Sequence, residues 1–149
     1  MSIFYYIELE TEYDLSKCKD ILLGDVRHEI ITATQSKLTL STEYFSLSLE
    51  NVNNSKDAFS SELGIKPTIS ITIYRVVRKN ENAVPELYRM FMRWVESSSD
   101  TAILLYEGEK VIILSQHDKL MRNDDPLIWR DDVNEVIDKE YTLRRFPTL

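Results

Sequence analysis

The chain has few of the residues that build disulfides, zinc sites and phosphate-binding loops. Its only cysteine is Cys18, so neither an intrachain disulfide nor a cysteine-rich zinc site can form. The three glycines, Gly24, Gly64 and Gly108, lie far apart, which excludes a phosphate-cradling glycine loop and a dinucleotide-binding fingerprint. Scarce cysteine is also typical of a reducing compartment, so we expect a cytoplasmic protein. Because these zinc-site and nucleotide-binding motifs are missing, we expect no cofactor.

Long apolar runs are missing as well. No stretch approaches the roughly 18 apolar residues of a membrane-spanning helix. The N-terminal segment reaches Glu8 and Glu10 with no basic region ahead of its apolar residues, which predicts that it is not a signal peptide. We expect no membrane partner.

Basic residues are outnumbered by acidic ones, 18 against 25, and the formal net charge is −7. This balance disfavours nucleic acid as a partner, because phosphate groups bind to concentrated basic surfaces. An acidic surface favours solubility or a basic protein partner.

Apolar residues alternate, or recur with helical spacing, along most of the 149-residue chain. Strands are predicted at Ile3–Leu9, Lys37–Leu40, Tyr44–Glu50, Thr68–Val77, Thr101–Tyr106 and Lys110–Ser115, with an ambiguous further strand at Val26–Thr34. Helices are predicted at Leu15–Leu23, at Pro85–Ser98 and from Asp132. Because hairpins dominate this order, we expect an α+β fold: a mainly antiparallel sheet with two to three helices packed on one face. Residues 1–149 are expected to form a single domain.

The remaining segments look like connections. Asn51–Ser61 is polar and is predicted to be a flexible loop, Asp118–Leu127 is predicted to turn the chain, and Tyr141–Leu149 shows no periodicity. In the predicted helix Pro85–Ser98, the apolar stripe includes Trp94, while Glu86 and three other charged residues are expected to face water. Those three are Arg89, Arg93 and Glu96.

No catalytic or metal-ligating set emerges from the pattern. The two histidines, His28 and His117, are most simply surface or turn residues, and Cys18 lies on the inward face of its helix. Carboxylates are paired at Glu107/Glu109, Asp124/Asp125, Asp131/Asp132 and Asp138/Glu140. Such oxygen ligands suit a divalent cation, but the spacing does not match a calcium loop. We expect a protein that is not an enzyme. The alternative is a small metal-assisted hydrolase that uses clustered carboxylates with His28 or His117.

Trp129 follows a polar turn and leaves two options open. It either docks against the hairpin at 101–115 or forms an exposed aromatic anchor for a partner, as binding hot spots often do. A further alternative is a self-associating structural domain, in which Trp129 and the exposed edge of the sheet form the contact of a homodimer.

The order of these patterns resembles a known family. An initial strand, an Asp-Leu-Ser helix start at Asp14, and Pro-Thr-Ile-Ser-Ile from Pro67 are followed by an amphipathic helix. Then come the hairpin segment Asp100–Leu114, an Asn-Asp-Asp turn from Asn123, and Trp129. This arrangement is similar to the Sit-type (swarm-inhibition) immunity proteins of myxobacterial polymorphic toxin systems, best over residues 66–129.

The resemblance implies a non-catalytic, cytoplasmic bacterial protein of one immunity-protein-like domain that binds a cognate toxin and neutralises it. Under this interpretation the acidic surface attracts a basic toxin domain. The partner-binding residues are then expected at the acidic hairpin tip and the following turn: Glu107, Glu109, Asp124, Asp125 and Trp129.

Overall fold

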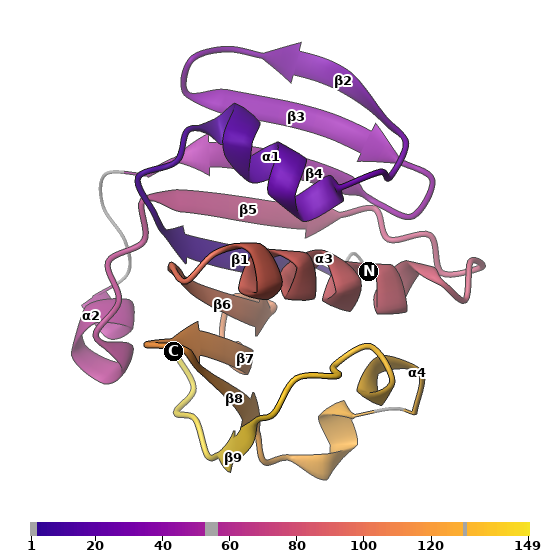
Figure 1. Cartoon of the computed structure of the whole chain (residues 1–149). Helices are drawn as coiled ribbons and strands as arrows, with labels where there is room; N and C mark the ends of the chain where they lie inside the picture. Colours follow the sequence, from indigo (N-terminus) through magenta and orange to yellow (C-terminus); the bar gives the residue numbers. More distant parts are fainter. Residues whose placement is uncertain (1–2, 53–56, 130) are drawn as a thin grey trace.

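The computed structural model of the chain describes residues 3–52, 57–129 and 131–149 (Figure 1). The strands are β1 Tyr5–Glu10, β2 His28–Ala33, β3 Lys37–Thr42, β4 Ser46–Asn51, β5 Ile69–Tyr74, β6 Thr101–Tyr106, β7 Lys110–Gln116, β8 Lys119–Asn123 and β9 Thr142–Arg144. The helices are α1 Leu15–Leu23, α2 Asp57–Leu63, α3 Ala83–Ser97 and α4 Asp131–Asn134, with a short 3-10 helix, η1, at Pro126–Ile128. None of the helices in these ranges is long and apolar enough to cross a membrane.

Within the described ranges, nine strands form one sheet in the order β2-β3-β4-β5-β1-β6-β7-β8-β9. All neighbouring strands are antiparallel except β8 and β9, which run parallel. In Figure 1 the sheet runs from β2 at the top to β9 at the bottom, and α1 and α3 lie in front of it.

The predicted fold class, an α+β sheet with its helices on one face, is wrong, although most strand pairs are antiparallel as expected. The chain forms a large mixed sheet that is covered on both faces. Along β6, Ala102 and Leu104 join the apolar cluster of α1 and α3, whereas Ile103 and Leu105 join a second cluster with α2. Because successive side chains of a strand point to opposite faces, these clusters lie on opposite sides of the sheet.

The first helix is confirmed as predicted. The Asp14 carboxylate caps α1 by accepting a hydrogen bond of 2.8 Å from the Lys17 N–H. Gly24 ends the helix with φ +54°, a backbone conformation that residues other than glycine rarely adopt. Cys18 is fully buried on the inner face, as expected.

The helix α3 carries a buried charge that the pattern did not predict. Glu86 was expected to face water, but it is only 6 % exposed. Its carboxylate lies 2.7 Å from the Arg93 guanidinium and 3.5 Å from that of Arg89. Arg93 also donates a hydrogen bond of 3.0 Å to the Leu22 carbonyl, so one arginine joins α1 to α3 while neutralising the buried carboxylate.

The predicted loop Asn51–Ser61 is wrong at Asn51 and from Asp57 onward, although Val52 lies outside any strand or helix. Asn51 ends β4, and residues from Asp57 onward form α2; residues 53–56 lie outside the described ranges. Two residues of α2, Phe59 and Leu63, are buried in the second cluster. They are separated by four positions and therefore share one helical face, which is too short a stripe to stand out in a polar segment.

The C-terminal strands were also missed. Residues 119–123 form β8 instead of a turn, and residues 142–144 form β9 instead of an unpatterned tail. His117 and Asp118 connect β7 to β8 with φ values of +54° and +61°. Positive φ at both central residues is the geometry of a two-residue hairpin, but the usual Asn-Gly or Asp-Gly signal is absent.

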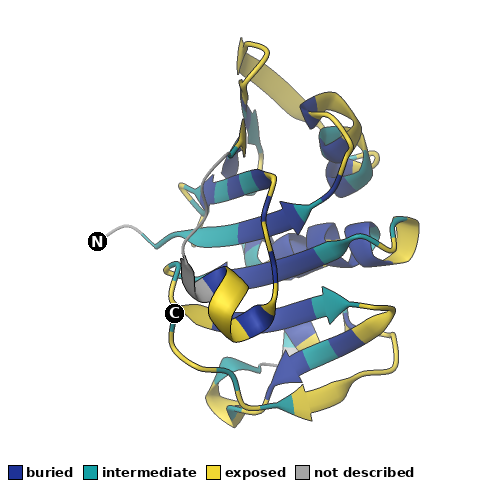
Figure 2. Cartoon of the chain, turned by 90° about the vertical axis from the view of Figure 1, so that its left-hand side faces the viewer, coloured by how far each residue is buried: buried dark blue, intermediate teal, exposed yellow. Residues whose placement is uncertain are grey.

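The ambiguous strand Val26–Thr34 is confirmed as β2, which forms one edge of the sheet. All six of its residues are exposed (yellow at the top of Figure 2). Ile30 and Ile31 are the large apolar side chains of this edge, exposed by 50 % and 59 %.

Candidate partner-binding surface

The fold brings two acidic segments of the sequence together. Glu107 and Glu109 at the β6–β7 turn, and Asp124 and Asp125 after β8, line one open hollow of about 510 Å³. The antiparallel pairing of β6, β7 and β8 explains this, because the β6–β7 turn and the end of β8 lie at the same end of neighbouring strands. Lys110 and Arg145 are the cations of this carboxylate hollow, so carboxylates outnumber cations by four to two.

The turn that carries Glu107 is held by the N-terminal segment. Glu107 adopts φ +56°, and its N–H donates a hydrogen bond of 2.9 Å to the Phe4 carbonyl. Its carboxylate accepts one of 3.2 Å from the Phe4 N–H. The Leu149 N–H donates to the Glu109 carbonyl at 3.0 Å, so both ends of the described chain position this turn.

The second acidic segment is organised around Asn123, which is 6 % exposed. Its side chain donates to the Val111 carbonyl at 2.7 Å and accepts from the Asp125 N–H at 2.9 Å. Asp125 in turn binds Lys110 at 2.7 Å and caps η1 by accepting from the Leu127 N–H. These two hydrogen bonds hold the pKa of Asp125 below its ordinary value. Asp124 lies 3.9 Å from the Arg145 guanidinium.

Trp129 lies outside the carboxylate hollow and is half-buried. Its indole N–H donates to the Asn123 carbonyl at 2.8 Å, and its ring contacts Tyr88 of α3 edge to face at 6.1 Å. Arg122 places its guanidinium 3.8 Å from the Trp129 ring centroid and 4.2 Å from that of Tyr141. The five residues expected to bind a partner are therefore divided: four line one hollow, and Trp129 packs beside it.

A second cavity adjoins the carboxylate hollow, and the sequence pattern did not indicate it. Three tyrosines, Tyr5, Tyr88 and Tyr106, line this pocket of about 280 Å³, together with the side chain of Leu127. We call it the tyrosine pocket. It shares Tyr106, Lys110 and Asp125 with the carboxylate hollow. Tyr5 of β1 lies opposite Tyr106 of β6, and their rings are in contact. This contact can be predicted only when the pairing register of β1 and β6 is known.

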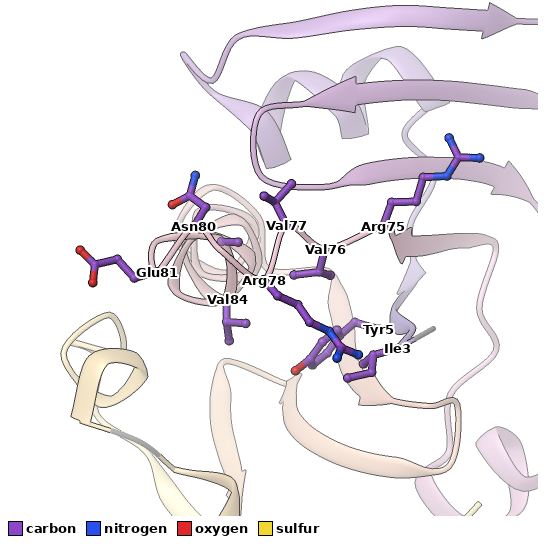
Figure 3. Close-up of a pocket in the computed structure, with 10 residues that line it drawn as sticks. Ile3, Tyr5, Arg75, Val76, Val77, Arg78, Asn80, Glu81 and Val84 are labelled. Atoms are coloured by element: carbon purple, nitrogen blue, oxygen red, sulfur yellow. The ribbon is translucent and has the colours of Figure 1, made fainter. Parts of the chain in front are cut away.

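A third hollow also has Tyr5 among its lining residues (Figure 3). It has a volume of about 560 Å³ and is lined by two arginines, Arg75 and Arg78, with Glu81 as its carboxylate. Arg78 extends toward Tyr5 and Ile3 (Figure 3). Arg75 follows directly after β5 and has φ +51°, which is uncommon for a residue other than glycine. We call this the arginine hollow.

The two histidines do not join the carboxylates. His28 belongs to β2 and His117 to the β7–β8 turn, with five strands between β2 and β7 in the sheet order. Neither lines the carboxylate hollow. In the described part of the chain, no group of three or more His, Cys, Asp or Glu residues could hold a metal ion.

Comparison with known proteins places the chain in a family. A family model described as SitI3-like matches residues 3–133, which is most of the chain. No curated protein and no solved structure matches it. The matched range includes the hairpin and the turn on which the sequence resemblance rests. The chain therefore belongs to the SitI3-like family, which confirms its resemblance to the Sit-type immunity proteins.

Proposed function

We propose that this protein is a non-catalytic immunity protein that binds a cognate bacterial toxin and neutralises it in the cytoplasm. Its membership of the SitI3-like family over residues 3–133 is the observation that carries the proposal. We further propose that residues 1–149 act as one immunity-protein-like domain, which agrees with the single sheet of the described residues.

The charge distribution supports a basic toxin surface as the target. The whole chain carries a formal charge of −7, and the carboxylate hollow has more carboxylates than cations. Complementary charges steer diffusional encounter and raise the association rate more than they raise affinity. An inhibitor that must capture a toxin before the toxin finds its substrate benefits from this effect.

Neutralisation by binding requires no reactive group on the inhibitor. In the described residues, Cys18 is buried and the histidines lie away from the carboxylate hollow. A protein that occludes a toxin needs a binding interface instead. Stable protein complexes bury roughly 1,200–2,000 Å² of accessible surface in such an interface.

Co-expression tests the proposal. A candidate toxin gene, sought first among the genes beside this one, is induced in a sensitive bacterial host, with and without the present chain. We expect growth arrest by the toxin alone, growth with both proteins, and a complex of one copy of each after purification. Continued growth arrest, with both proteins shown to be expressed, would contradict the proposal.

Self-association is a second candidate, and the exposed β2 edge favours it. An unpaired edge strand can pair with a second copy. An antiparallel β2–β2 pair centred between Ile30 and Ile31 would set Glu29 opposite Thr32, without like charges facing each other. Sedimentation equilibrium tests this. A dimer that Ile31→Lys dissociates supports it, and a monomer at all concentrations excludes it.

A further inference from the structure

The tyrosine pocket occupies a central place between two hollows of opposite charge. It shares Tyr5 with the arginine hollow, and it shares Tyr106, Lys110 and Asp125 with the carboxylate hollow. The three cavities therefore adjoin one another, along a strip of residues that includes parts of β1, the β6–β7 hairpin and the start of α3. Protein interfaces have this anatomy: an aromatic, apolar centre and a charged rim.

The size of the tyrosine pocket indicates what enters it. Its volume of about 280 Å³ lies just below the roughly 300–1,000 Å³ of pockets that enclose a small-molecule ligand. One large side chain of a partner fits it better than a complete ligand. Leu127, which is 91 % exposed at its rim, adds apolar surface that is covered only when something docks there.

From this geometry we propose that the toxin inserts one apolar or aromatic side chain of a surface loop into the tyrosine pocket. The same loop places a basic residue against the carboxylate hollow and an acidic residue against the arginine hollow. This inference rests on the proposed immunity function and specifies the binding surface and the chemistry of the partner. It places the energetic centre of the interface at Tyr5, Tyr106 and Leu127, none of which the sequence singled out.

The charges at the two ends fix the direction of the bound loop. At one end, Glu107 and Glu109 are exposed, and neither has a side-chain cation within salt-bridge distance among the described residues. At the other end, Arg78 extends toward Tyr5, whereas the side chains of Arg75 and Glu81 point away from it (Figure 3). A loop that bound in the reverse direction would set like charges against both ends, which is unfavourable.

Binding of the toxin domain that this protein neutralises in the co-expression test, purified in an inactive form, tests the inference by calorimetry. Leu127→Glu places a carboxylate at the pocket rim and alters a side chain that is too exposed to contribute to the core. We expect its Kd to rise at least about 30-fold, as substitution of a hot spot does. Glu109→Lys should lower the association rate and weaken its dependence on salt concentration.

Leu143→Glu is the matched control, because it makes the same substitution at an exposed leucine of β9 that lines none of the three cavities. We expect its Kd to stay within twofold of that of the unmodified chain. The inference is overturned if Leu127→Glu binds within twofold of the unmodified chain, or if Leu143→Glu alone loses binding. It is also overturned if sedimentation shows that Leu127→Glu dissociates a dimer, which would place a second copy in the pocket. Failure of the unmodified chain to bind would contradict the immunity function itself.

Discussion

Glu86 shows how one buried charge is compensated by an ion pair and what that pair does for the fold. The carboxylate is nearly inaccessible on α3, and its closest cation, Arg93, also binds the carbonyl of Leu22 at the end of α1. Helical spacing could not predict this, because the position of α1 relative to α3 decides whether the polar side of α3 faces water. Replacing a single partner of a buried ion pair leaves an uncompensated charge, which costs more than the pair itself contributes.

We therefore predict that Arg93→Met lowers the free energy of unfolding by about 2 kcal/mol, from the lost ion pair and the lost hydrogen bond. Urea denaturation measures the change. Arg89→Met is the control: Arg89 is 3.5 Å from the same carboxylate but its side chain is 45 % exposed, so we expect a loss of less than about 0.5 kcal/mol. Equal losses for the two variants would contradict this account.

Cys18 was expected to be an inert core residue, and the pKa of its thiol allows that expectation to be tested. Burial, together with the charges of Asp14 and Asp100, raises the pKa of the thiol to about 12. The reactive species is the thiolate. At pH 8.5 we predict that the folded chain resists iodoacetamide for hours and that the urea-unfolded chain reacts within minutes. Rapid alkylation of the folded chain would show that the thiol is accessible.

The same shift has a consequence for stability at alkaline pH. The unfolded thiol loses its proton near its ordinary value of 9.0, whereas the folded thiol keeps its proton up to about 12. Between these values the unfolded state binds fewer protons than the folded state, so the contribution of Cys18 to the free energy of unfolding falls as the pH rises. Cys18→Ala removes this term, and comparison of the two pH profiles isolates it.

At the level of elements, the sequence predicted best where local signals agree with the final packing. The α1 helix has a capping aspartate and a terminal glycine, and the β6–β7 hairpin has a glycine in its loop between two apolar runs. Segments α2, β8 and β9 were missed because they are short and because their stabilising contacts are distant in sequence. Phe59 of α2, for example, is buried by residues of β6 and β7.

The β7–β8 turn provides a prediction at this scale. Asp118 adopts φ +61°, where a side chain costs energy that glycine does not incur. Asp118→Gly is expected to raise the free energy of unfolding by about 0.5–1 kcal/mol, measured by urea denaturation. The control is Lys119→Gly at the next position, in β8, which should destabilise the chain because glycine weakens a strand. A destabilised Asp118→Gly variant would contradict the assigned turn geometry.

For the whole molecule, the sequence anticipated the acidic character and the two acidic segments, but not the strip that they border. Nothing in the local pattern of residues 5, 88 and 106 shows that β1, α3 and β6 meet at one pocket, since that depends on strand order. Strand order in turn depends on the packing of the complete sheet, in which β1 lies between β5 and β6. The family membership then connects this surface to toxin binding as a proposal.

The central claim, neutralisation by stoichiometric binding, is tested most directly by titrating the activity of a fixed amount of toxin with increasing amounts of this protein. We predict that toxin activity falls linearly and reaches zero at one molecule of this protein per toxin molecule. Activity that is abolished by far less than one equivalent would show a catalytic antagonist, and activity that persists above one equivalent would show that this protein does not neutralise the toxin. Either result would contradict the account.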